Sequence, residues 1–219
     1  MPPKNLDKII SLLKKEVEKF DIPIATKIGD KIRDPFRVLI SCILSLRTKD
    51  TTTGPACERL FKLATTPQKM LKLPNKKIEK AIFPVGFYPT KARYIKATCR
   101  KLIEDYNSEV PDTMEGLKTL PGIGNKCAGL TLIYGYNKVD CIPVDVHVQV
   151  IANRLGWVKT NNPDKTMYEL MEIIPHKYWY DLNNLLVAHG QNICLTNSPF
   201  CSKCSIRKYC PRIGVLKAR

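Results

Sequence analysis

The sequence predicts an almost entirely α-helical protein, and three observations lead to this. Apolar residues recur at spacings of three and four along the chain, proline-containing helix starts are repeated, and only one stretch is rich in β-branched residues. The first pattern opens the chain, where apolar residues share one face of an expected helix: Leu6, Ile9, Ile10, Leu13, Val17 and Phe20. An amphipathic first helix follows from this spacing.

Further helix starts are marked by a capping residue followed by proline, the pair favoured at the N-cap and the first helical position. Three such pairs occur: Asp34-Pro35, Thr66-Pro67 and Asn162-Pro163. The helix after the first pair, residues 36–46, is apolar nearly all round, so we expect it in the core. Asp112 and Glu115 have the spacing of a capping box for another short helix. Residues 139–148 form the β-branched stretch, which Pro143 interrupts.

The chain is strongly basic, with a formal net charge of +16. Residues 65–101 contain ten Lys or Arg and one acid, and residues 203–219 contain six basic residues and no acid. Such density favours a polyanionic partner, nucleic acid above all, with a solubilising surface as the alternative. The basic blocks are broken by Pro and Gly, unlike a membrane-surface helix.

No membrane or secretory segment is expected. The longest nearly uncharged run, residues 38–46, is too short to span a bilayer. The N-terminus interleaves lysines with apolar residues, so it lacks the apolar core of a secretory signal. We therefore expect a cytoplasmic protein.

The cysteines fall into two groups. Five are scattered through expected apolar helices and are interpreted as small buried residues: Cys42, Cys57, Cys99, Cys127 and Cys141. The other four lie within 17 residues, spaced C-x6-C-x2-C-x5-C: Cys194, Cys201, Cys204 and Cys210. Four thiolates this close indicate a metal centre, and both zinc and a [4Fe-4S] cluster accept four cysteines. A single C-x2-C knuckle with longer arms favours the cluster, and zinc is the alternative.

The stretch LPGIGNKCAG, residues 120–129, predicts a hairpin between two helices. Gly122 and Gly124 let the backbone turn and leave N–H groups uncovered by any Cβ. A helix beginning near Asn125 would add its own N–H groups and positive end, which suits a DNA phosphate. A plain loop is the alternative.

Lys126 falls in the first turn of that expected helix. A cation is poorly placed there because the helix N-terminus carries partial positive charge. A neutral amine is favoured instead, since the helix dipole and partial burial both lower a lysine pKa, and a neutral amine is a nucleophile. A solvent-exposed helix lysine is the alternative.

The motif PVDVHV carries Asp145 and His147 near the end of the β-branched segment, where an acid could converge with the lysine on one cleft. At this point the chain resembles the endonuclease III family of DNA glycosylases, in the helix-hairpin-helix, Gly/Pro-rich-loop, Asp superfamily. The resemblance runs nearly end to end and rests on ordered motifs: DPFRVLISCILS, VGFYPTKARYI, LPGIGNKCAG, VDVHV, ANRLGW and the cysteine spacing.

The resemblance implies a catalytic pair, with Lys126 as nucleophile and Asp145 as catalytic carboxylate. A damaged base would be flipped out of the duplex, and the neutral amine would attack C1′ as the base leaves. A Schiff base would then permit β-elimination of the 3′ phosphate. A lysine at this position implies a bifunctional glycosylase and AP lyase, because branches that only remove bases generally lack it.

The resemblance further implies a mainly structural [4Fe-4S] cluster that holds a basic loop against the DNA backbone. The partner is double-stranded DNA containing damaged bases or abasic sites, bound by a monomer. The expected DNA contacts are Arg47, Phe87, Gly122, Gly124, His147, Lys203, Arg207 and Lys208.

Several residues depart from the family pattern. Arg47 stands where the family usually has Gln, and it could bond the orphaned partner base, with guanine favoured; a phosphate contact is the alternative. Phe87 matches a position often held by a leucine wedge, with a core aromatic as the alternative. Asn125 and Val150 each replace a common Arg. These changes leave the lesion and opposite-base preferences open.

The expected architecture is all-α, with two helical domains flanking a DNA-binding cleft. One domain, residues 28–140, carries the helix-hairpin-helix. The other combines residues 1–27 with residues 141–219 and holds the cluster loop. The predicted activity is base excision repair of oxidised pyrimidines such as thymine glycol. The alternatives are a lyase for oxidised guanine or a mismatched base, and a non-catalytic DNA-binding module with structural zinc. We expect the protein to be a prokaryotic enzyme that is associated with the nucleoid.

Overall fold

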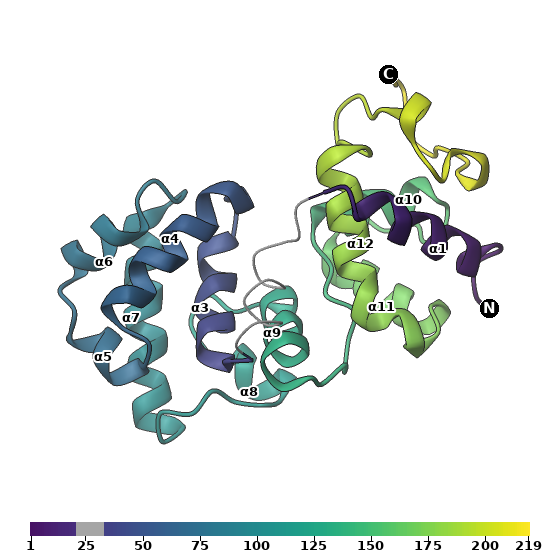
Figure 1. Ribbon diagram of the computed structural model, residues 1–219. Coiled ribbons are helices and arrows are strands. Elements are labelled where there is room, and N and C mark those ends of the chain that lie inside the picture. Colours follow the sequence, from purple (N-terminus) through teal and green to yellow (C-terminus); the bar gives the residue numbers. More distant parts are fainter. Residues whose placement is uncertain (21–32) are drawn as a thin grey trace. The chain divides into compact units, whose positions relative to one another are not determined.

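The computed structural model describes residues 1–20 and 33–219 (Figure 1). The predicted all-α class is confirmed, because the described residues form helices joined by loops and contain no β-strand. No helix in this part of the chain combines the length and apolar character needed to cross a membrane. The chain divides into two compact units, each described by itself below. The predicted domain boundary after residue 27 lies outside the described residues.

The first unit, called here the middle unit, spans Ile24–Asp140. Its helices follow in this order: α3 (Pro35–Ser45), α4 (Asp50–Leu63), α5 (Pro67–Lys72), α6 (Asn75–Ile82), α7 (Tyr88–Asp105), α8 (Met114–Lys118), α9 (Asn125–Thr131) and the π-helical η1 (Leu132–Tyr136). α3 is the centre of this unit and contacts α4, α7 and α9. Its residues Phe36 to Leu44 are nearly all buried, as the sequence predicts.

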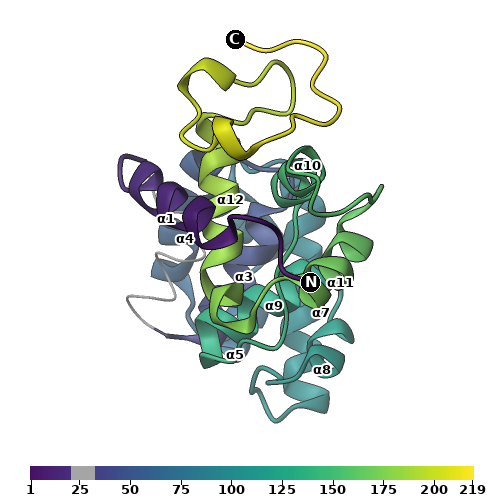
Figure 2. The same ribbon diagram turned by 90° about the vertical axis from the view of Figure 1, so that its right-hand side faces the viewer.

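The second unit, called the terminal unit, combines Met1–Pro23 with Cys141–Arg219. It contains α1 (Leu6–Val17), α10 (Val146–Arg154), α11 (Pro163–Ile173), η2 (His176–Tyr178), α12 (Trp179–Asn192), η3 (Cys201–Lys203) and η4 (Arg207–Tyr209). α12 contacts both α1 and α10, and most of its length is buried. The cysteine loop follows α12, and Figure 2 shows it as the yellow end of the chain.

The predicted capping pairs form as expected. The Asp34 side chain accepts a hydrogen bond from the N–H of Arg37 at 3.1 Å, and α3 begins at the following proline. Thr66 and Asn162 cap α5 and α11 in the same way. Each cap satisfies one N–H that the first helical turn would otherwise leave without a partner.

The predicted capping box at Asp112 and Glu115 is wrong. Thr113 is the N-cap of α8, and its hydroxyl accepts the N–H of Gly116 at 3.2 Å. The Asp112 carboxylate instead pairs with Lys138, a residue far along the chain. The ion pair with Lys138 lowers the pKa of Asp112 through its hydrogen bond and its charge. A neighbouring hydroxyl with the right geometry therefore replaces the carboxylate as the cap.

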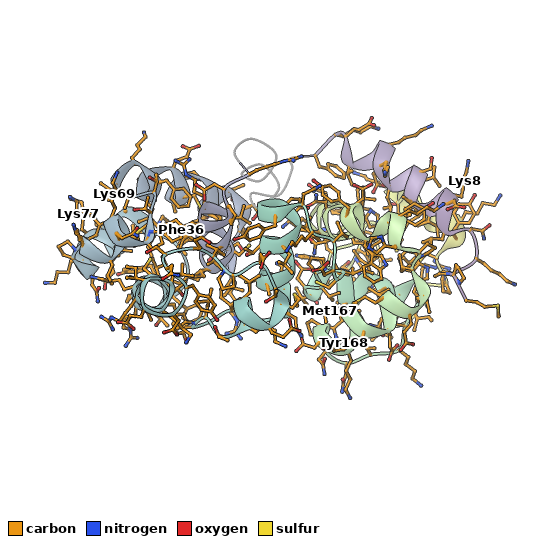
Figure 3. The ribbon with its side chains drawn as sticks, turned by 90° about the horizontal axis from the view of Figure 1, so that it is seen from below. Lys8, Phe36, Lys69, Lys77, Met167 and Tyr168 are labelled. Carbon is orange, nitrogen blue, oxygen red and sulfur yellow. The ribbon has the colours of Figure 1, made fainter. Side chains whose placement is uncertain are left out.

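The basic segment between residues 65 and 101 does not all face solvent. Lys69 on α5 and Lys77 on α6 are exposed and project outward (Figure 3). Lys91 and Lys96 on α7 instead turn their amines onto backbone oxygens of the same unit. Lys91 is only 4% exposed, so the sequence-based count overstates the basic surface by this residue.

Candidate active site and metal centre

The predicted hairpin joins α8 to α9, and its two glycines have different structural reasons. Gly122 has φ of 78°, a left-handed conformation that favours glycine, and a Cβ there would lie 3.1 Å from the ring of Tyr94. Gly124 is the N-cap of α9, where a Cβ would meet nothing within 4 Å. Ile123 between them is buried and fixes the turn to the core. The hairpin therefore presents a bare backbone beside an uncrowded helix start.

Lys126 lies in the first turn of α9, which begins at Asn125 as the sequence predicts. Its side chain is half-buried, and no side chain caps this helix at Gly124. The next residue, Cys127, is buried and hydrogen-bonded to Cys42 of α3. That hydrogen bond lowers the pKa of Cys127, and the nearby charge of Lys126 lowers it further. Lys126 thus follows the bare hairpin directly and precedes a buried residue of α9.

Asp145 is the N-cap of α10. Its Oδ1 accepts the N–H of His147 at 2.9 Å and that of Val148 at 3.1 Å. These two bonds fix the direction of the carboxylate, which is half-buried. The preceding segment is fixed as well, because Asn183 of α12 donates to the carbonyl of Pro143 at 2.7 Å.

The β-branched stretch of residues 139–148 forms no strand, and the chain turns into helix at Val146. His147 consequently lies in the first turn of α10. Its imidazole packs on Gly190 of α12, where a Cβ would lie 2.8 Å from the ring nitrogen Nδ1. The β-branched residues favour a strand, but the cap supplied by Asp145 stabilises the helix instead.

Arg47 and Phe87 stand on two loops of the middle unit. Both have left-handed backbones, with φ of 51° and 57°, and both side chains are exposed. Phe87 is 62% exposed, so the alternative that it is a core aromatic is wrong. An exposed aromatic beside an exposed arginine is a combination typical of surfaces that insert into nucleic acid.

The four cysteines near the C-terminus line one pocket of the terminal unit, with about 410 Å³ of empty space including space open to solvent. Its other walls are largely apolar, and include Ile151, Ile193, Phe200 and Ile206. Within the described residues, no three His, Cys, Asp or Glu side chains are close enough together to hold a single metal ion. The four cysteines, which lie up to 16 positions apart in the sequence, therefore share the lining of one pocket.

Arg154 at the end of α10 holds the start of the cysteine loop, and sequence reasoning missed it. The guanidinium is buried, with 8% exposure. Its Nη1 donates to Cys194 Sγ at 3.2 Å and to the carbonyl of Leu195 at 2.8 Å, and its Nη2 donates to the carbonyl of Thr196 at 2.7 Å. The signal that could have identified Arg154 was its position in the motif ANRLGW.

Arg154 also changes the chemistry of a candidate metal ligand. Burial raises the pKa of Cys194, but hydrogen bonds from His189 and Arg154 outweigh it and lower the pKa. Metal ligands are thiolates, so this environment favours the ligating form.

His189 and Glu16 tie the first helix to the cysteine loop. His189 of α12 is 1% exposed, and its Nε2 lies 3.8 Å from Cys204 Sγ. Its Nδ1 pairs with Glu16 of α1, whose other oxygen accepts the N–H of Ser205 at 3.0 Å. Burial alone would lower the pKa of His189, but hydrogen bonds with Cys194, Cys204 and Glu16 raise it. The loop is thus fixed from two sides, by α10 and by α1.

The remaining predicted contacts are on this loop. Lys203, Arg207 and Lys208 are all exposed, on or beside the short turns η3 and η4. The predicted residues therefore fall into two sets, one in each unit. The hairpin, Lys126, Arg47 and Phe87 belong to the middle unit; Asp145, His147 and the cysteine loop belong to the terminal unit.

Comparison with known proteins decides the family. Residues 40–176 match the family described as HhH-GPD superfamily base excision DNA repair protein, which is more than half of the chain. The chain belongs to this superfamily. The matched range contains the hairpin, Lys126, Asp145 and both exposed loops, so the superfamily match and the candidate residues coincide.

Within the HhH-GPD superfamily, the chain is similar to endonuclease III proteins. It is 41% identical over 180 residues to "Endonuclease III" of Thermotoga maritima, covering 82% of this chain and 84% of the relative. It is 37% identical to "Endonuclease III homolog 2, chloroplastic" of Arabidopsis thaliana, covering 96% of this chain and 58% of the relative. The solved structure of a trapped covalent intermediate of endonuclease III with DNA matches with a TM-score of 0.81, at 30% identity, covering 94% and 95% of the two chains.

These similarities confirm the sequence-based prediction of an endonuclease III family enzyme, a DNA glycosylase and AP lyase of base excision repair. The described fold agrees with the predicted class as well. The roles of the individual residues stay predictions.

Replacing Arg154 with Met should loosen the cysteine loop. The methionine keeps much of the apolar stem but leaves the carbonyls of residues 194–196 without their donor, which should cost about 2–3 kcal/mol of unfolding free energy. Denaturant unfolding measures the loss, and amide hydrogen exchange should quicken in residues 194–200. The control is Arg207→Met on the same loop, whose side chain is exposed and should cost little. Equal stability of the two variants would contradict this assignment.

Proposed function

We propose that this HhH-GPD protein removes oxidised pyrimidines from double-stranded DNA and cleaves the strand with Lys126 as nucleophile. The observation that carries the proposal is the position of Lys126, half-buried in the first turn of α9, directly after the bare backbone of the hairpin. The positive end of a helix favours the neutral form of an amine over its cation. A neutral amine is the nucleophile that this chemistry needs.

Base removal is the first step. The damaged nucleotide leaves the base stack, because its glycosidic bond is inaccessible inside the duplex. The Lys126 amine attacks C1′, the C1′–N bond breaks, and the bonding pair leaves with the base, which takes up a proton. Positive charge develops on the sugar as that bond breaks. A carboxylate near the sugar offsets this charge, and we assign this role to Asp145.

Strand cleavage follows from the same covalent bond. The attached sugar opens to a Schiff base, in which the nitrogen draws electrons from C1′ and acidifies the proton on C2′. Loss of that proton breaks the C3′–O bond and releases the 3′ phosphate. Hydrolysis of the Schiff base then frees the amine. A proton acceptor is needed at C2′, and Asp145 can assist this transfer as well.

DNA is held by backbone contacts of two kinds in this proposal. The N–H groups of the Gly122–Gly124 hairpin and the start of α9 suit a phosphate, and they do not depend on base sequence. Lys203, Arg207 and Lys208 would contact phosphates from the cysteine loop, while His147 adds a contact from α10. A single copy of the chain carries all of these residues, which agrees with a monomer acting on damaged or abasic duplex DNA.

The cysteine loop fits a [4Fe-4S] cluster. All four cysteines line one pocket, and hydrogen bonds from His189 and Arg154 lower the pKa of one of them, Cys194, which favours its thiolate. A cubic cluster separates its ligand sulfurs, whereas zinc holds them about 2.3 Å from one ion. Cys194, Cys201, Cys204 and Cys210 would be the ligands. When bound, the cluster supplies structure by fixing the basic loop.

The preference for a lesion depends on the exposed loops. Arg47 would enter the space left by the flipped nucleotide and donate to the orphaned base, and guanine accepts such bonds at O6 and N7. Phe87 would act as the wedge that keeps the neighbouring base pairs parted. Oxidised guanine or a mismatched base is the second candidate substrate, because Arg47, Asn125 and Val150 differ from the common pattern.

Lys126→Ala should abolish covalent trapping. Borohydride reduces a Schiff base to a stable amine, so wild-type protein should form an adduct with abasic-site DNA and the variant should not. Adduct formation is read on a denaturing gel. Lys118→Ala removes a similar charge from α8 on the other side of the hairpin and should trap normally. An undiminished adduct in Lys126→Ala would disprove the assignment of the nucleophile.

Asp145→Asn should separate chemistry from structure. Asparagine is as good an N-cap as aspartate, so α10 and the thermal stability should be kept. The negative charge is lost, and single-turnover base release should slow by about 10²–10⁴-fold. Asp34→Asn makes the same change at the N-cap of α3 and should leave the rate unchanged. Loss of DNA binding by Asp145→Asn would point to a structural role instead.

A panel of duplexes tests the substrate. Single-turnover incision should be fastest for an oxidised pyrimidine such as thymine glycol, and guanine should be the favoured opposite base. Arg47→Gln should weaken that opposite-base preference while trapping on abasic DNA continues. Faster incision of oxidised guanine or of a mismatch would support the second candidate. Trapping without release of any base would reject the glycosylase step.

A further inference from the structure

Lys91 is the buried charged group that the proposed chemistry leaves unused. It lies in the first turns of α7, with 4% of its surface exposed. An ammonium removed from water is costly unless its donors are satisfied. Its Nζ donates to the carbonyl of Leu44 at 2.7 Å, to the hydroxyl of Thr48 at 3.0 Å and to the carbonyl of Leu46. Three N–H donors thus meet three oxygens.

Two of those oxygens belong to the end of α3. The last carbonyls of a helix have no partner within it, and the helix dipole makes this end partly negative. A lysine from another helix satisfies both requirements at once. Lys91 therefore fixes the point where the chain leaves α3 for the loop that carries Arg47.

The third oxygen links this loop to a second one. The Thr48 hydroxyl accepts from Lys91 and also accepts the N–H of Gly86 at 3.2 Å. Thr48 follows Arg47 in the chain, and Gly86 precedes Phe87. The loops also approach closely, since a Cβ on Gly86 would lie 3.1 Å from the carbonyl oxygen of Arg47. One hydroxyl and one ammonium thus bind the two loops together.

The residues at the tips of these loops are strained and exposed. Arg47 and Phe87 both have positive φ, which costs a non-glycine residue roughly 1 kcal/mol or more and persists only where the surroundings impose it. Lys91 and Thr48 provide such surroundings. Lys91 is not a second nucleophile, because its amine is buried and its three donors are all engaged by oxygens of the protein.

We propose that Lys91 is a positioning residue, which acts through Thr48 to hold Arg47 and Phe87 at a fixed separation for extrusion of the target base. This inference rests on the proposed function, in which those two side chains enter the duplex. If both side chains are already fixed, they can part the duplex without first being ordered. The conformational entropy of ordering them is then lost during folding rather than during DNA binding.

Lys91→Met should impair extrusion and spare covalent chemistry. Single-turnover base release from duplex DNA should fall by roughly ten- to a hundredfold. Borohydride trapping on single-stranded abasic DNA, where no duplex must be parted, should be unchanged. The fluorescence rise of 2-aminopurine placed next to the lesion, which reports unstacking on binding, should also be lost. A merely structural role would reduce trapping in proportion to base release.

Two further variants keep the test decisive. Thr48→Val has nearly the same shape and removes only the hydroxyl that joins the loops, so it should show the same split between duplex and single-stranded substrates even if Lys91→Met does not fold. Lys96→Met is the matched control, because this lysine lies on α7 as well but donates to the carbonyl of Leu73 at 2.8 Å, away from both loops. It should behave as wild type.

The outcomes separate this inference from the proposed function. Normal base release and a normal fluorescence rise in folded Lys91→Met or Thr48→Val would overturn the inference alone. Equal loss of duplex release and single-stranded trapping would overturn it too, because positioning of the loops should not affect trapping. Wild-type protein that neither releases bases nor forms an adduct would instead overturn the proposed function. If Arg47→Ala and Phe87→Ala both left duplex base release unchanged, the proposed DNA contacts of these two residues would be overturned.

Discussion

The need of a helix start for hydrogen-bond acceptors governs both proposed catalytic positions. The first N–H groups of every helix lack partners within the helix. At α10, Asp145 meets this need, and the same two hydrogen bonds that cap the helix aim its carboxylate. At α9, Gly124 supplies no side-chain cap, and the turn before it is stripped of Cβ atoms. One helix start is capped by an acid, and in the proposed function the other receives a phosphate from outside.

Buried cations act as donors to backbone carbonyls, at a helix end and in an irregular segment. Lys91 meets the carbonyls where α3 ends, and Arg154 meets those where the cysteine loop begins. Backbone oxygens accept hydrogen bonds from both of these cations. Breaking such an arrangement leaves several carbonyls without donors at once, so each cation stabilises a loop conformation more than it stabilises the core.

Local signals in the sequence predicted local structure well, because they act over three or four residues. The proline-marked starts of α3, α5 and α11, the hairpin and the position of Lys126 all follow from neighbouring residues. The failures were long-range. Lys91 was counted as surface charge because its acceptors lie more than 40 positions away, and Arg154 was passed over because the cysteine loop is equally distant. Asp112 lost its predicted capping role to Thr113 because Lys138 engages its carboxylate.

In the proposed function, chemistry and specificity are carried by different kinds of structure. Lys126 and Asp145 stand at helix starts, where backbone geometry is regular, and the hydrogen bonds that cap α10 also orient Asp145. Arg47 and Phe87 stand on loops with left-handed backbones, and hydrogen bonds of Lys91 and Thr48 join these loops. In the proposed function, a change in either loop would therefore alter which base is extruded without disturbing the residues that attack it. This separation is why the class of reaction can be read from the sequence, whereas the lesion depends on contacts that form only in the folded protein.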